Sequence, residues 1–180
     1  DVSYFMRHEG ADIAWHTRHI SKLIADAQHK SVPAGTLVRA RLSRWGEGLE
    51  VMVYTPDQPD LFARICGYLD QAGFSILDAR IHTAKNGYAL DTFQLIATNL
   101  TDHYRELITM VESGLTQTLI HSGPLPAASR GRVSRRVKSF PITPRVSLQP
   151  DEKAQRWLLS VSASDRTGLL YNIAQVLARN

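Results

Sequence analysis

One strand–loop–helix pattern occurs twice in the 180-residue chain, and this repeat constrains the fold more than any other feature. The segment DQPDLFARICGYL begins at Asp57, and it reappears as DRTGLLYNIAQVL beginning at Asp165. Apolar residues occupy matching positions at a constant offset: Val53, Leu61, Ile65 and Leu69 correspond to Val161, Leu169, Ile173 and Leu177. A repeated unit indicates that one supersecondary structure is used twice.

The first copy continues into a predicted β-hairpin. Residues 51–54 alternate as a half-buried strand does, and the apolar stripe that follows predicts a helix with Gly73 at its C-terminal cap. Strands are predicted at 76–83 and 88–97. Between them lies Asn86-Gly87, a dipeptide that tolerates positive φ at both central positions of a turn. The order so far is strand, helix, strand, strand.

Two further elements complete a ferredoxin-like α+β fold of the order βαββαβ. A second helix is predicted after Thr101 or Asp102. Residues 142–148 alternate as a strand, and we expect them to be the fourth strand of the first unit. Pro141 and Pro144 restrict that strand to an edge or a bulge.

The chain divides into three predicted parts. Residues 1–34 form a helical segment, and residues 35–148 form the first unit, which begins with an entry hairpin and contains a basic linker at 122–139. Residues 149–180 contain only the first strand and helix of a second unit. The chain starts without methionine and stops where the second copy would continue, so we expect a fragment of a longer protein.

Composition sets broad limits on location and partners. The chain is 43% hydrophobic and 21% charged, which suffices for one or two modest cores. Its apolar runs are too short to span a bilayer, and a cytoplasmic location without membrane contact fits. The single cysteine, Cys66, excludes an intrachain disulfide, and a small buried hydrophobe is its favoured role. The net charge of +4 permits an acidic partner without requiring one.

The familiar catalytic motifs are absent from the sequence. It contains no phosphate-binding loop, nucleophile elbow, HExxH or CxxC pattern. His16 and His19 lie three residues apart on a predicted helix, but no further ligands at metal-binding spacing surround them. We therefore expect solvated or capping histidines, no metal site, no cofactor and no catalytic residue in this chain.

The repeated loop is instead suited to a small ligand. A strand that ends at a helix N-terminus presents unpaired N–H groups and a positive dipole end, which favour a carboxylate. An adjacent aspartate can hold an ammonium group. Together these groups suit an α-amino acid, although Asp and Pro also begin many helices that bind nothing.

These features resemble tandem ACT domains, which are amino-acid-sensing regulatory modules. The segment DARIHTAKNGYALDTF at residues 78–93 is more specific. Together with residues 54–63, 14–18 and 162–170, it resembles the C-terminal part of the bifunctional PII uridylyltransferase/uridylyl-removing enzyme family. The resemblance covers nearly the whole chain.

The resemblance implies a regulatory role within a larger enzyme. In that family a nucleotidyltransferase domain uses Mg²⁺ and UTP to uridylylate the PII signal protein, an HD hydrolase domain removes the UMP, and the ACT pair senses glutamine. Residues 1 to about 30 would follow the HD domain. Neither catalytic centre lies in this chain, so the resemblance implies a non-catalytic fragment of a catalytic parent protein.

The resemblance also assigns candidate glutamine-binding residues. They lie in the two loops and at the start of the second strand: Asp57, Gln58, Pro59, Asp60, Leu61, Asp165, Arg166, Thr167, Gly168, Leu169 and Ser75. The usual loop glycine is Asp60 in the first copy, where its carboxylate would repel that of a ligand. Gly168 keeps the glycine, so the second loop is the better candidate.

Two other readings remain open. Residues 86–93 resemble the third-strand signature of RNA-recognition motifs, but Leu90 and Asp91 depart from it, which argues against RNA as a partner. A docking module without any ligand is the second alternative. Because the second unit is incomplete, we expect residues 157–180 to pack on the first unit or to be completed by another chain through self-association.

Overall fold

The computed structural model describes residues 2–44, 48–96, 103–121, 123–127, 143–151, 156–164, 166 and 168–179. The elements are α1 (Val2–Arg7), α2 (Gly10–His29), β1 (Leu37–Leu42), β2 (Leu49–Pro56), α3 (Leu61–Gln71), β3 (Ser75–Arg80), β4 (Tyr88–Ile96), α4 (Tyr104–Ile120), β5 (Arg145–Asp151), β6 (Arg156–Ser162) and α6 (Leu169–Ala178). No helix in these described ranges is long and apolar enough to cross a membrane.

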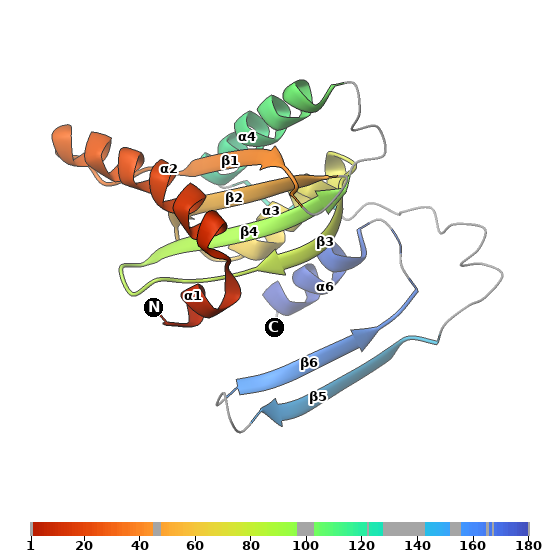
Figure 1. Ribbon diagram of the computed structural model, residues 1–180. Helices are drawn as coiled ribbons and strands as arrows, with labels where there is room; N and C mark the ends of the chain where they lie inside the picture. The colour runs from red at the N-terminus through yellow and green to blue at the C-terminus, as the bar shows by residue number, and fades with distance from the viewer. Residues whose placement is uncertain are drawn as a thin grey trace.

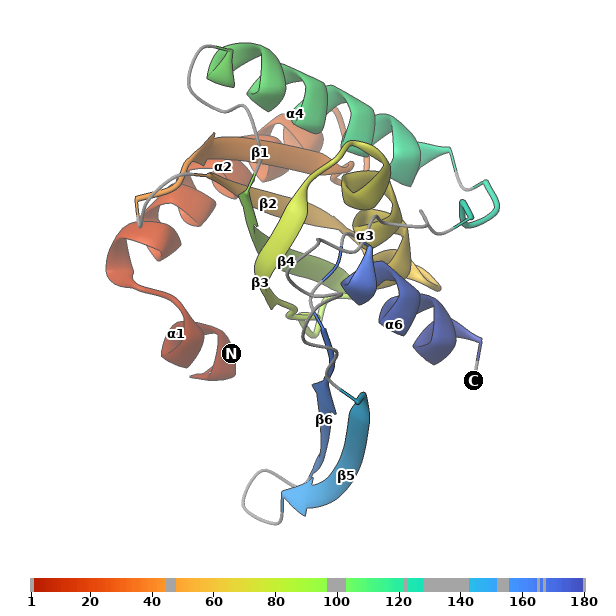
Figure 2. The ribbon, with the colours of Figure 1, turned by 90° about the vertical axis from the view of Figure 1, so that its right-hand side faces the viewer.

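The main sheet contains four antiparallel strands in the spatial order β1-β2-β4-β3 (Figure 1). Helices α3 and α4 cover one face of this sheet, and α2 lies across the opposite face (Figure 2). The predicted α+β class is confirmed, because this arrangement is consistent with the ferredoxin-like fold of ACT domains.

The predicted fourth strand was wrong. The segment expected at 142–148 contributes to β5, which pairs with β6 in a separate two-stranded sheet, while Ile142 lies outside the described residues. The fourth strand of the main sheet is β1, which pairs with β2 from Leu37↔Tyr54 to Leu42↔Leu49. A short hairpin closes at a low entropic cost, and it fills the edge of β2 that a later strand would need.

This pairing changes the order of the repeated unit to ββαββα. The hairpin β5–β6 and helix α6 then correspond to β1, β2 and α3, and the spacing of 108 residues between the copies extends back to the first strand of each. The expected boundary at 148/149 falls inside β5, so the second copy contains one strand more than predicted.

The glycines predicted to end α3 and to form the turn before β4 both have a positive φ. Gly73 has a φ of 81°, its N–H donates to Asp70, and the next N–H donates to Leu69, which is the Schellman pattern. Gly87 has a φ of 77° in the turn before β4. Asn86 does not share that positive φ, so the predicted two-residue left-handed turn is confined to the glycine.

Strand β2 is buried on both faces rather than half-buried. Val51 and Val53 point into the main core with residues of α3 and α4. Met52 and Tyr54 point the other way, into a second core beneath Trp15 of α2. The predicted alternation of side chains between the two faces of β2 was correct. However, α2 covers the face that the sequence predicts to be exposed to solvent.

The C-terminal copy packs on the first unit through its helix. Tyr171 and Ala174 of α6 are buried in the main core, as the first of the two expected outcomes requires. Leu177 of the same helix is exposed, as are Val146 and Trp157 of the hairpin. Self-association remains a prediction.

Candidate functional site

The two repeated loops share one backbone geometry. Each helix is preceded by a residue in the left-handed region: Asp60 with a φ of 59° before α3, and Gly168 with a φ of 77° before α6. In each loop the first helical N–H donates to the carbonyl three residues earlier, Leu61 to Gln58 at 3.3 Å and Leu169 to Arg166 at 3.2 Å. Aspartate tolerates this conformation better than most residues, which explains why it can replace the glycine.

A cavity of about 150 Å³, the second-loop cavity, lies between the start of α6 and the end of α3. Arg166, Gly168 and Leu169 line it from the second loop, and Ser75 lines it from the start of β3. Four predicted effector residues therefore meet at one place. Asp70, which is 6% exposed, adds a carboxyl group to the wall.

A second cavity of about 290 Å³, the first-loop cavity, lies beside the β2–α3 loop. Asp57, Gln58, Asp60 and Leu61 line it from that loop, and α6 closes another side. Pro59 does not line either cavity. Asp165 and Thr167 lie outside the described residues, so the structure does not place them.

The two cavities are counterparts under the 108-residue repeat. Each lies between the loop of one copy and the helix of the other. Seven lining residues of one cavity correspond to lining residues of the other: Gln58 to Arg166, Asp60 to Gly168, Leu61 to Leu169, Phe62 to Leu170, Ala63 to Tyr171, Cys66 to Ala174 and Asp70 to Ala178. The chain therefore has two related cavities whose lining residues carry different charges.

Helix α6 is held in place by Tyr171. Its ring lies where a side chain at Gly67 of α3 would be, because an added Cβ would come within 2.8 Å of the ring. Its hydroxyl donates to the Pro126 carbonyl at 2.5 Å, and Gln175 donates to the same carbonyl at 3.0 Å. Within the predicted linker, Leu125 and Pro126 are therefore half-buried, while Gly123, Pro124 and Ala127 are exposed. The contact fixes the helix that borders both cavities.

Asp91 of β4 is the most perturbed acid near the two cavities. It is 1% exposed and lines the first-loop cavity. Its Oδ1 accepts a 3.2 Å hydrogen bond from the His82 N–H, whereas Oδ2 has no hydrogen-bond partner among the described residues. Burial, with a smaller contribution from Asp57, raises the pKa of Asp91 from 3.8 to about 7.

Cys66 lies close to this acid but is not a reactive thiol. It is buried in the main core. Burial, followed by the charge of Asp91, raises its pKa to about 12. The thiolate, which is the nucleophilic form, is therefore suppressed, and the predicted role as a small buried hydrophobe is confirmed.

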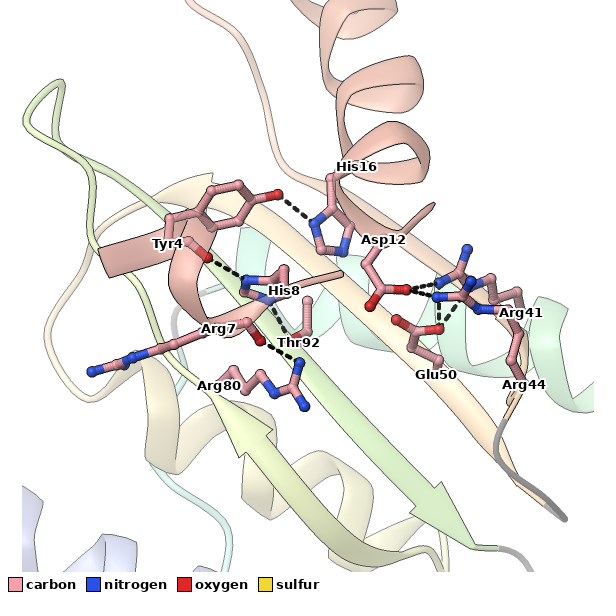
Figure 3. Close-up of polar contacts among 10 residues, drawn as sticks. All are labelled: Tyr4, Arg7, His8, Asp12, His16, Arg41, Arg44, Glu50, Arg80 and Thr92. Atoms are coloured by element: carbon pink, nitrogen blue, oxygen red, sulfur yellow. Dashed lines mark hydrogen bonds and ion pairs between the residues drawn. The ribbon is translucent and has the colours of Figure 1, made fainter. Parts of the chain in front are cut away.

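A polar network joins α2 to the main sheet (Figure 3). Arg41 of β1 contacts Asp12 and Glu50 at 2.6 Å each, and Arg44 also pairs with Asp12. The Arg41 guanidinium lies 4.0 Å from the centre of the Trp15 ring. These contacts place the N-terminal helix firmly on the sheet face opposite α3.

A second part of the network joins α1 to α2 and β4. The Tyr4 hydroxyl lies 2.6 Å from Nδ1 of His16, and His8 Nε2 lies 3.3 Å from the Thr92 hydroxyl (Figure 3). His16 is fully buried, so the expectation of a solvated or capping histidine was wrong for this residue. No group of three metal-binding side chains occurs in the described part of the chain.

Sequence reasoning missed the burial of Asp91 and of His16 for different reasons. Asp91 interrupts an apolar run between Ala89 and Phe93, and this isolated charge was an available signal. Asp12 and His16 are four residues apart, so they share a helix face, but nothing in the sequence identifies that face as the buried one.

The fold and the paired loop cavities define an α+β protein consistent with the ferredoxin-like ACT fold. Comparison with known proteins is more specific. The protein family described as "Uridylyltransferase GlnD fifth domain" matches residues 1–19. The chain is 54% identical to the bifunctional uridylyltransferase/uridylyl-removing enzyme of Ralstonia nicotianae and 52% identical to that of Cupriavidus pinatubonensis. Each match covers the whole chain.

The chain therefore belongs to the family of bifunctional uridylyltransferase/uridylyl-removing enzymes. It spans 21% and 20% of the length of these two relatives. The resemblance read from residues 54–63 and 78–93 is confirmed at the level of the family.

Proposed function

We propose that this chain is the amino-acid-sensing region of a bifunctional uridylyltransferase/uridylyl-removing enzyme, and that glutamine is the effector. The observation that carries this proposal is the meeting of Ser75 with Arg166, Gly168 and Leu169 around the second-loop cavity. Residues from both copies contribute to the same cavity, so a bound effector would link the two units.

The chemistry of the second-loop cavity suits a small zwitterion. The Arg166 guanidinium and the positive dipole end at the start of α6 favour an α-carboxylate. The Asp70 carboxyl favours the ammonium group, and the Ser75 hydroxyl can both donate to and accept from a side-chain amide. Gly168 carries no side chain, which allows a ligand to approach the backbone closely.

In this proposal the catalytic work belongs to other parts of the parent protein. Those parts use Mg²⁺ and UTP to uridylylate the PII signal protein in the cytoplasm, and they also remove the group. The present chain contributes regulation and no catalytic residue. In the parent protein, α1 and α2 would directly follow the hydrolase domain. The polar network ties these two helices to the sheet.

RNA binding is the weaker alternative. In an RNA-recognition motif the third-strand aromatics stack bases on an open sheet face. Here Phe93 is buried in the main core, and Tyr88 stacks on Tyr54 beneath α2. Within the described residues, β4 therefore presents no open aromatic platform.

Isothermal titration of the chain with glutamine tests the proposal. We expect binding that is weakened about tenfold or more in Arg166→Gln, because a charge-assisted hydrogen bond is lost. The matched control is Arg18→Gln, which removes an arginine from α2 outside both loop cavities. Equal affinities for Arg166→Gln and the native chain, or no heat with glutamine, would contradict the proposal and favour a docking module without ligand.

A further inference from the structure

The first-loop cavity has a buried acceptor that the folded chain does not use. Oδ2 of Asp91 is enclosed and has no hydrogen-bond partner among the described residues. An unsatisfied buried carboxylate oxygen is costly, and native structures keep such groups mainly where a ligand or another function requires them. Because Asp91 lines the cavity, a ligand there can reach it.

The rest of the cavity wall selects for positive charge. Asp57 and Asp60 add two more carboxyl groups at the loop side. None of the described residues that line the cavity is a lysine, arginine or histidine. The counterpart of Arg166 in this cavity is Gln58, so the cation that would attract a carboxylate is missing. An anion or a zwitterion is therefore disfavoured here.

Apart from Gln58 and Thr83, the remaining lining residues are apolar. They come from α3, the β3–β4 segment, β4 and α6, and they include Leu61, Phe62, Ile81, Ala89, Ala174 and Leu177. A ligand that fits has a cationic head near the carboxyl groups and an apolar body along these side chains. A primary ammonium group supplies three donors, enough for Asp91 and one loop carboxylate together.

We propose that the first-loop cavity binds a primary ammonium group carried on a short alkyl chain, with Oδ2 of Asp91 as its buried acceptor. This site is separate from the second-loop cavity that we propose for glutamine. The two repeated loops would then recognise ligands of different charge.

Proton release should accompany this binding. The groups that act on Asp91 are the carboxyl of Asp57 on the loop, the thiol of Cys66 on α3 and the backbone N–H of His82, and the carboxyl of Asp60 lines the same cavity. The residues of α6 that line the cavity are not titratable. Since the pKa of Asp91 is about 7, a bound ammonium would favour its carboxylate form and displace a proton at neutral pH.

The experiment is an NMR titration of the ¹⁵N-labelled 180-residue chain with n-butylammonium chloride at pH 7. We expect saturable shifts of the Leu61, Ala63 and Ala89 amides, and none of comparable size with n-butanol or sodium butyrate. Asp91→Asn should weaken the affinity about tenfold or more. The control Asp26→Asn, which neutralises an exposed acid on α2, should leave the affinity unchanged.

A second variant keeps the test decisive if Asp91→Asn does not fold. Asp57→Asn combined with Asp60→Asn changes only exposed side chains, and it should weaken butylammonium binding at least threefold. Equal shifts with butanol, unchanged affinity in both variants, or no saturable shift at all would overturn the proposal. Glutamine binding is measured through Arg166→Gln, so either proposal can fail without the other.

Discussion

The hydroxyl of Tyr4 and Nδ1 of His16 share a 2.6 Å hydrogen bond, which joins α1 to the buried face of α2. Burial raises the pKa of Tyr4 to about 12 and lowers that of His16 to about 4, so both side chains are neutral near pH 7. Nε2 of His16 has no hydrogen-bond partner among the described residues.

Acid should destabilise the fold through His16. Its pKa is lowered mainly by burial and then by His8, so the unfolded chain binds a proton near pH 6.5 and the folded chain only near pH 4. Stability supplied by the neutral ring is complete above pH 6.5 and is lost as pH falls to 4, by about 3 kcal/mol. Urea unfolding at pH 7.5 and 4.5 should show this loss as a change in the difference between the free energies of unfolding of the native chain and of His16→Gln, since Asp91 titrates in both. A difference that does not change with pH would contradict the prediction.

Asp91 should act in the opposite direction. Its pKa is raised from 3.8 to about 7, so the folded chain keeps a proton that the unfolded chain releases near pH 4. Stability is therefore complete below pH 4 and falls by about 4 kcal/mol as pH rises to 7. Asp91→Asn removes this titration. As pH rises from 4 to 7, the free energy of unfolding of the variant should therefore increase relative to that of the native chain. Because the effects of His16 and Asp91 partly cancel, each is measured against its own variant.

The contact of Arg41 with Asp12 should be worth more than an exposed ion pair. A double-mutant cycle with Arg41→Gln and Asp12→Asn should give a coupling energy of about 1–3 kcal/mol, because Asp12 is buried. The control cycle is Arg80→Gln with Asp78→Asn, an exposed pair at 3.2 Å, which should give less than about 1 kcal/mol. Equal coupling energies in the two cycles would show that the network does not stabilise the N-terminal helix.

Gly67→Ala should loosen α6. The new Cβ would lie 2.8–2.9 Å from two ring atoms of Tyr171 and 3.1 Å from Pro126, so the ring must move. We expect a loss of about 1–3 kcal/mol and faster amide hydrogen exchange in α6 than in α4. Gly10→Ala is the control, since its Cβ would meet nothing within 4 Å. Unchanged exchange in α6 would mean that Tyr171 does not anchor the helix.

The features that depend on a few adjacent residues could be predicted from the sequence. The cap at Gly73, the turn at Gly87 and the apolar stripe of α3 are each encoded within one or two turns of chain. The choice of fourth strand failed because β1 and residues 142–148 alternate equally well, and only pairing decides between them. Likewise, Met52 is buried only because α2 crosses the sheet, which no local pattern records.

For the candidate site, the sequence located the loops but not their surroundings. The repeat identified Gln58, Asp60, Arg166 and Gly168, all of which line cavities. Asp70 and Asp91 reach those cavities through the packing of α6 and the pairing of β4, so their roles depend on tertiary contacts. The assignment of Arg166 and Ser75 to a single cavity likewise required the position of α6.

The 108-residue repeat also has an evolutionary consequence. In a symmetric homodimer one codon encodes the same residue in both copies of a site, so every mutation changes the two sites together. Here the loop positions at Asp60 and Gly168 are encoded separately, as are Gln58 and Arg166. A mutation in one loop can therefore change the lining of one cavity and leave the lining of the other as it is.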